Sequence, residues 1–102
     1  MENIRILHND EIKRIIMGTP IGHDHLRLLI EINDGNKLLL PEACIAAIVR
    51  AYCTIKTHPS VESLEMINKE LPERKPGFAQ YQLVEESRPN KEISNELKRI
   101  ID

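Results

Sequence analysis

The chain has 102 residues, of which 41% are hydrophobic, 29% are charged and only 3% are aromatic. This composition excludes a disordered chain, and the length suits one domain with a modest, mainly aliphatic core. The formal net charge is −2, and acidic residues equal or outnumber basic ones in both 1–58 and 59–102. Because neither half is basic, we expect no nucleic-acid partner.

The sequence also bears on the compartment. No stretch approaches the roughly 20 apolar residues that a membrane span needs, so no membrane partner is expected. The N-terminus lacks the basic-then-apolar layout of a signal peptide. Cys44 and Cys53 are nine residues apart in one expected helix, on opposite sides, and cannot bridge each other. We expect two buried thiols in a reducing compartment, and therefore a cytoplasmic protein.

The first elements in chain order are the least sharply defined. Residues 3–7 favour β structure. Residues 10–17 are predicted as a short helix that Asp10 caps and Gly18 ends. The alternation of apolar and polar residues from Ile12 leaves a strand as the alternative.

A β-hairpin is predicted over 26–40 from alternating apolar residues around Asn-Asp-Gly. A three-residue loop at 33–35, with its glycine in the left-handed conformation, sets Glu31 opposite Lys37 and apolar residues opposite each other. A two-residue loop would instead set Glu31 opposite Leu38. We prefer the first register because it pairs opposite charges.

Residues 41–57 are mostly apolar and are predicted as the helix that organises the domain, with Pro41 at its first position. When the helix is wound at about 100° per residue, a wide apolar arc faces the core. The remaining strip consists largely of small residues and contains Arg50 near its middle. That strip would let another backbone approach closely, so it is a candidate partner surface.

Three further elements follow. We predict a helix from Ser60 to Leu71, a strand over 78–85 and a last helix after Pro89-Asn90. The fold class is therefore α+β: a small single domain over 1–102, with an antiparallel sheet of about three to four strands and helices packed mainly on one face.

Two histidines form the candidate metal site. His23 and His25 lie at the entrance to the strand that begins near Leu26. If the extended backbone reaches back to His23, both project from the same face as Arg27. Two neutral imidazoles at that spacing can hold one divalent transition metal, but further ligands are needed. The alternative is a pair of solvated histidines at the end of a loop.

The candidate ligand- or partner-binding residues are Arg50, Glu42 and Arg27. Arg50 is the one charge between Glu42 and Lys56, so it either marks the solvent side of the helix or holds a carboxylate through its planar guanidinium. Cys44 lies in the first turns of the same helix, where a thiol can be activated, but its place in the apolar arc favours inert burial.

Phosphate-binding glycine loops and the common hydrolase, zinc-protease and dithiol motifs are absent from the sequence, so an enzyme is less expected than a binding protein. The first hypothesis is a binding or regulatory module that acts through protein contact as a homodimer. Leu29 and Leu39 point away from the face of Leu28 and Ile30, so their apolar side chains still have to be buried by another surface. The second is a metal-binding protein or small metal-dependent enzyme that uses His23 and His25.

Overall fold

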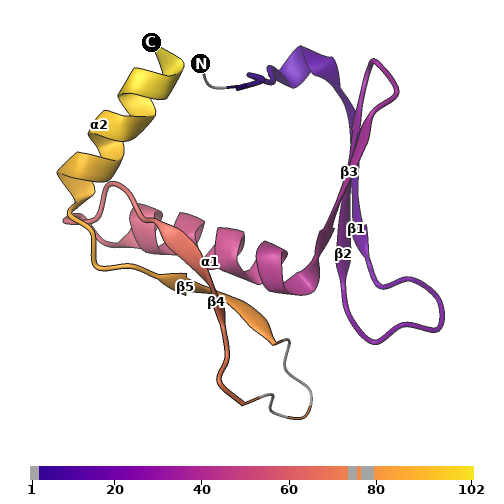
Figure 1. Cartoon of the computed structure of the whole chain (residues 1–102). Helices are drawn as coiled ribbons and strands as arrows, with labels where there is room; N and C mark the ends of the chain where they lie inside the picture. Colours follow the sequence, from indigo (N-terminus) through magenta and orange to yellow (C-terminus); the bar gives the residue numbers. More distant parts are fainter. Residues whose placement is uncertain (1–2, 74–75, 77–79) are drawn as a thin grey trace. The chain divides into compact units, whose positions relative to one another are not determined.

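The computed structural model describes residues 3–73, 76 and 80–102 of the chain (Figure 1). The chain divides into two compact units, Met1–Ile45 and Ala46–Asp102. Each unit pairs its strands antiparallel, three in the first and two in the second. The α+β class is confirmed, although the strands form two sheets instead of one. The single domain over 1–102 stays a prediction.

The first unit begins with a short 3-10 turn, Asn9–Glu11, followed by the strand β1, Ile12–Gly18. The helix predicted over 10–17 is therefore wrong, and the alternative strand is correct. A helix of eight residues is marginal by itself, whereas pairing with a neighbouring strand satisfies the backbone along the whole segment. Residues 3–7, expected to favour β structure, form no strand.

The strands β2, Arg27–Ile32, and β3, Lys37–Pro41, form the predicted hairpin. Its register places Glu31 opposite Lys37, which confirms the three-residue loop. Gly35 has φ +94°, and its N–H donates to the carbonyl of Ile32 at 2.9 Å. The glycine is needed here because L side chains rarely adopt this left-handed conformation.

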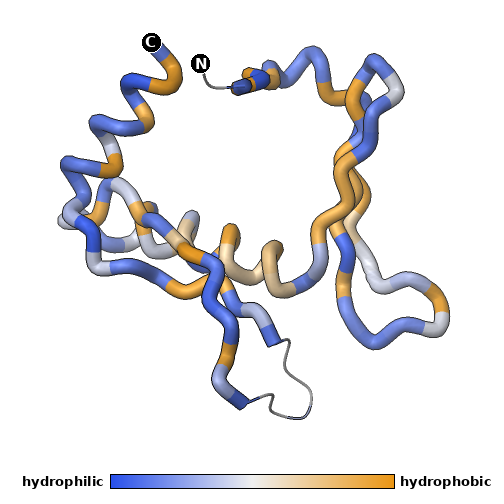
Figure 2. The backbone as a smooth tube through the Cα atoms, viewed as in Figure 1, coloured by the Kyte–Doolittle hydropathy of each residue, from blue (hydrophilic) through white to orange (hydrophobic). Residues whose placement is uncertain are grey.

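β2 lies between β1 and β3, so these two strands are the edges of the sheet. Ile32 is its best buried apolar residue, at 4% exposure. Next to it, Glu31 is buried against Arg14, whose Nε lies 2.6 Å from its carboxylate. Figure 2 shows stretches of hydrophobic residues along the strands of this sheet, interrupted by hydrophilic positions.

The helix α1, Glu42–Thr57, confirms the central helix, although Pro41 closes β3 and is not the first helical residue. Ile45 and Ala47 are buried, as the apolar arc predicts. The prediction is wrong for three members of the same arc, since more than half of each side chain is exposed: Ile48, Val49 and Tyr52. The arc is thus only partly a core surface.

The two predictions about the cysteines have different outcomes. Cys44 and Cys53 are both free thiols, in agreement with the helix geometry that keeps them apart. Cys44 is half-buried, but Cys53 is exposed, so the expectation of two buried thiols is wrong for Cys53. Cys53 lies in the narrow strip of the helix, outside the arc that supplies the buried residues.

The second unit contains the strands β4, Met66–Glu70, and β5, Tyr81–Glu85. The helix predicted from Ser60 to Leu71 is wrong. Its apolar spacing fits a helix, but pairing with β5 satisfies the backbone of β4, as the register shows by setting Met66 opposite Glu85. The strand predicted over 78–85 is present from Tyr81 on, and positions 78 and 79 lie outside the described residues.

The predicted last helix is α2, Asn90–Ile101. Its Asn90 side chain accepts hydrogen bonds from the backbone N–H groups of Glu62 and Ser63, and donates to the carbonyl of Ser60. These bonds hold the segment before β4 in a non-helical conformation. Among the described residues, no helix is long and apolar enough to cross a membrane.

Candidate functional site

Three of the predicted site residues meet where β2 begins and α1 starts. One carboxylate oxygen of Glu42 accepts a hydrogen bond from the backbone N–H of Leu26 at 3.0 Å, and the other lies 3.2 Å from Nδ1 of His25. The Leu26 bond, and then the contact with His25, lower the pKa of Glu42 below its ordinary value. Glu42 therefore carries a negative charge, and its two carboxylate oxygens already contact Leu26 and His25.

The guanidinium of Arg27 is also partly engaged at this junction. Its Nη1 donates to the carbonyls of His25 and Leu26, at 3.2 and 3.0 Å. Its positive charge contributes to the lowered pKa of Glu42. Glu42 and Arg27 thus belong to one cluster, as two of the three predicted ligand-binding residues.

Arg50, the third predicted residue, is not part of that cluster. It is eight residues beyond Glu42 on α1, which places it roughly 12 Å further along the helix axis. Its backbone carbonyl accepts from Thr54, but within the described ranges its exposed side chain has no hydrogen bond or ion pair. This agrees with a residue on the solvent side of the helix.

The metal hypothesis gains no additional ligand from the structure. His25 is engaged with Glu42, and His23 is exposed in a turn where its backbone N–H donates to the carbonyl of Pro20. In the part of the chain that the structure describes, no group of three or more His, Cys, Asp or Glu side chains could hold a metal ion. Among the described residues, the proposed metal site therefore has only His23 and His25 as ligands.

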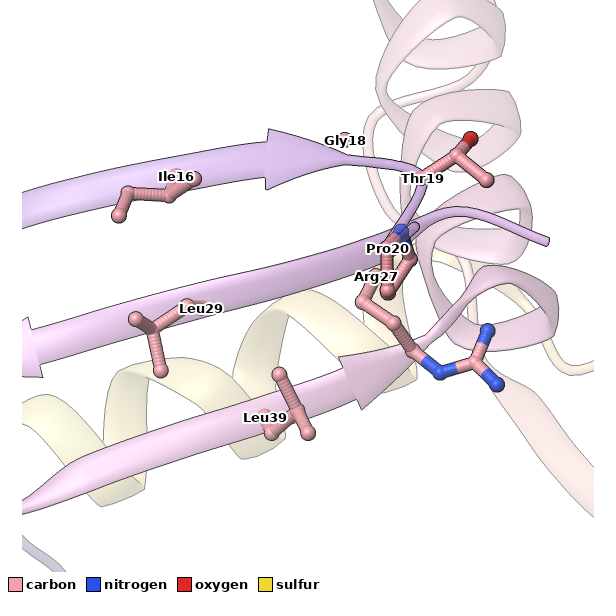
Figure 3. A pocket seen from close by; sticks show the side chains of 7 residues that line it. All are labelled: Ile16, Gly18, Thr19, Pro20, Arg27, Leu29 and Leu39. Atoms are coloured by element: carbon pink, nitrogen blue, oxygen red, sulfur yellow. The ribbon is translucent and has the colours of Figure 1, made fainter. Parts of the chain in front are cut away.

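An apolar hollow lies on one face of the three-stranded sheet (Figure 3). Ile16, Leu29 and Leu39 come from the three neighbouring strands and form a row across its floor, and the guanidinium of Arg27 extends away from them. The hollow has a volume of about 230 Å³. The other lining residues are Gly18, Thr19 and Pro20. Small-molecule pockets are usually larger, at roughly 300–1,000 Å³, so this surface fits one or two side chains of a protein better.

The edge strand β1 has the longest run of exposed apolar residues in this sheet. Three consecutive residues, Ile15, Ile16 and Met17, are exposed by 57%, 45% and 55%. Because consecutive residues of a strand point to opposite faces, both faces are apolar at this edge. The sequence-based interpretation missed this surface because it assigned the segment to a helix, although the run of three large apolar residues was visible.

No protein-family model matches this chain, and no curated protein or solved structure matches it at a significant level.

Proposed function

We propose that this protein is a small binding or regulatory module that acts through protein–protein contact and forms a homodimer through its three-stranded sheet. The observation that carries the proposal is the exposure of Ile15, Ile16 and Met17 on the edge strand β1. Exposed apolar residues that are contiguous, unlike single ones scattered over a surface, are typical of interaction sites.

The two faces of the sheet support the same proposal. Leu39 is 64% exposed beside Ile16 and Leu29 on one face, and Leu38 is 49% exposed on the other face. Antiparallel sheets commonly bury one face and solvate the other, which gives strict alternation of apolar and polar residues. This sheet departs from strict alternation, because one face is apolar throughout and the other carries the apolar row of Ile16, Leu29 and Leu39 between charged residues.

A second copy of the chain is the partner that the composition of the sheet favours. The row of Ile16, Leu29 and Leu39 is apolar, and Glu31 next to it is already paired with Arg14 and lies 3.9 Å from Lys13, so two copies can meet there without an unpaired buried charge. Closed twofold dimers are the commonest oligomers, and they use the same surface patch on both subunits.

The compartment proposed for this module is the cytoplasm. Cys44 and Cys53 are both free, and Cys53 is exposed. Free thiols persist in a reducing compartment, where disulfides are rare.

Light scattering coupled to size-exclusion chromatography tests the homodimer over a range of protein concentrations. We expect the mass of a dimer for the parent chain and a weakened dimer for Ile16→Lys, because the lysine charge would be buried in the interface. The matched control is Ile21→Lys, which makes the same change at a fully exposed loop position of the same unit. The control should dimerise like the parent chain.

Two results would contradict the proposal. One is a monomeric parent chain at the highest concentration that stays soluble. The other is a dimer that Ile16→Lys and Ile21→Lys leave equally intact, since the sheet would then not be the contact surface.

A further inference from the structure

In the first sheet, one hydrogen bond shows to which side each backbone N–H and C=O of β2 points. The N–H of Ile32 donates to the carbonyl of Asn36, in the turn that leads into β3. The N–H and C=O of a strand residue point to one side, and those of the next residue point to the other side. Ile30 and Leu28 therefore point toward β3, whereas Glu31 and Leu29 point toward β1.

The same alternation fixes the free edge of β1. Arg14 and Ile16 are the register partners of Glu31 and Leu29, so their backbone groups point inward to β2. The backbone groups of Ile15 and Met17 consequently point outward from the sheet. β1 is an edge strand, and among the described residues these outward N–H groups donate to no carbonyl outside the sheet. They form an unpaired row that another strand can extend.

We propose that β1 pairs antiparallel with β1 of a second copy, about a twofold axis at Ile16, and joins the two sheets into one of six strands. This inference rests on the proposed homodimer and specifies its geometry. A twofold axis in an antiparallel pair passes between two equivalent residues, so Ile16 lies opposite its own copy. The backbone N–H and C=O of Ile15 then bond to those of Met17 of the second copy, and those of Met17 bond to Ile15 of the second copy.

The charges of β1 favour this register over one with the axis at Ile15. With the axis at Ile16, Arg14 lies opposite Gly18, which has no side chain, and an added Cβ at Gly18 would meet nothing within 4 Å. Gly18 therefore leaves room beside Arg14 of the opposite strand, whose guanidinium is bonded to Glu31 of its own copy. With the axis at Ile15, Arg14 would instead lie opposite Ile16 and Lys13 opposite Met17. That register places two charges against apolar residues and costs more.

β3, the other edge of the sheet, is less suited to strand addition. By the same alternation, its outward positions are Lys37, Leu39 and Pro41. Proline has no N–H to donate, so Pro41 cannot supply a donor to an added strand. β1 contains no proline and is two residues longer than β3. The geometry therefore favours β1 as the dimer edge.

Cysteine cross-linking tests this pairing in the full chain with Cys44→Ser and Cys53→Ser as the background. Ile16→Cys should form a covalent dimer under mild oxidation, since directly opposite, non-hydrogen-bonded residues have Cα atoms about 4.5 Å apart. Gly18→Cys is the register control, because two copies of residue 18 would lie roughly 13 Å apart along the strands. Leu39→Cys is the edge control, on the same face and more exposed than Ile16.

The possible results distinguish a failure of the β1 pairing from a failure of the homodimer itself. Cross-linking of Ile16→Cys, with little at Gly18→Cys and Leu39→Cys, supports the β1 pairing. If light scattering shows a dimer but Ile16→Cys does not cross-link, or Leu39→Cys cross-links faster, the β1 geometry is wrong and the homodimer stands. If the background chain and the parent chain are both monomeric, the proposed function and this inference fail together.

Discussion

The carboxylate of Glu42 ties the first turn of α1 to the entrance of β2, because it accepts the backbone N–H of Leu26 at 3.0 Å. The same carboxylate lies 3.2 Å from His25, whose backbone carbonyl accepts a bond from Arg27. A helix N-terminus favours a negative charge, so the position of Glu42 also suits the helix dipole. One ionised side chain at the start of α1 therefore bonds to the backbone just before β2.

The first prediction concerns the pH dependence of this junction. The hydrogen bond from Leu26 and the contact with His25 hold the pKa of Glu42 below its ordinary value of 4.5. The stability that Glu42 contributes is therefore fully present above pH 4.5 and is lost as the pH falls through the lowered pKa. Glu42→Gln should be less stable than the parent chain at neutral pH, and this difference should shrink in acid.

Urea denaturation from about pH 7 to about pH 3 measures this difference. Glu92→Gln, in the first turn of α2, is the control, since no hydrogen bond of its carboxylate is found among the described residues. A difference between Glu42→Gln and the parent chain that stays constant over this pH range would contradict the assignment.

The second prediction concerns the core of the first unit. Ile32 is 4% exposed, and Ile32→Ala should lower the free energy of unfolding by about 2–5 kcal/mol, through lost burial and the cavity left behind. Ile21→Ala changes a fully exposed isoleucine and should alter it by less than about 0.5 kcal/mol. Equal effects of the two changes on the urea midpoint would show that Ile32 is not in a packed core.

The third prediction concerns the hairpin loop. Gly35→Ala forces an L side chain into a conformation with φ +94°, which should cost roughly 1–2 kcal/mol. Gly18→Ala should be neutral or slightly stabilising, because Gly18 has no positive φ and its added Cβ meets open space. Thermal unfolding followed by circular dichroism compares the two variants, and a larger loss for Gly18→Ala would rule out the loop geometry.

The fourth prediction concerns the start of α2. Asn90→Ala removes the acceptor of the Glu62 and Ser63 N–H groups, and Ser63 is only 6% exposed. Leaving a buried donor unpaired should cost about 1–3 kcal/mol in urea denaturation. Asn95→Ala lies on an exposed part of the same helix and should have little effect. If both changes cost the same, the Asn90 bonds do not stabilise the segment before β4.

Further polar contacts lie near Asn90 in the second unit. The Ser63 hydroxyl bonds to the hydroxyl of Ser94, and Arg88 forms ion pairs with Glu65 and Glu96, at 3.0 and 3.1 Å. These pairs join the segment before β4 to α2 within the second unit. Sequence patterns could not reveal them, because the partners are separated by eight to 31 positions and none belongs to a recognisable motif.

The sequence by itself determined the hairpin of β2 and β3, α1 and α2. In each case the information is local: Glu31 and Lys37 select one loop length, Gly35 permits the turn, and apolar periodicity marks the helices. It also singled out Glu42 and Arg27 as candidate binding residues, which stays a prediction, but it did not indicate their common cluster with His25.

Only the tertiary structure decided the state of residues 10–17 and 60–71. The spacing of 10–17 fits either a helix or a strand and that of 60–71 fits a helix, but strands formed at Ile12–Gly18 and Met66–Glu70, where β2 and β5 satisfy the backbone. The exposed row on β1 followed from that pairing, and it moved the favoured contact surface from the Arg50 strip of α1 to the edge of the first sheet. Backbone hydrogen bonding between distant segments has no local signature, and for this reason the sequence left the interaction surface open.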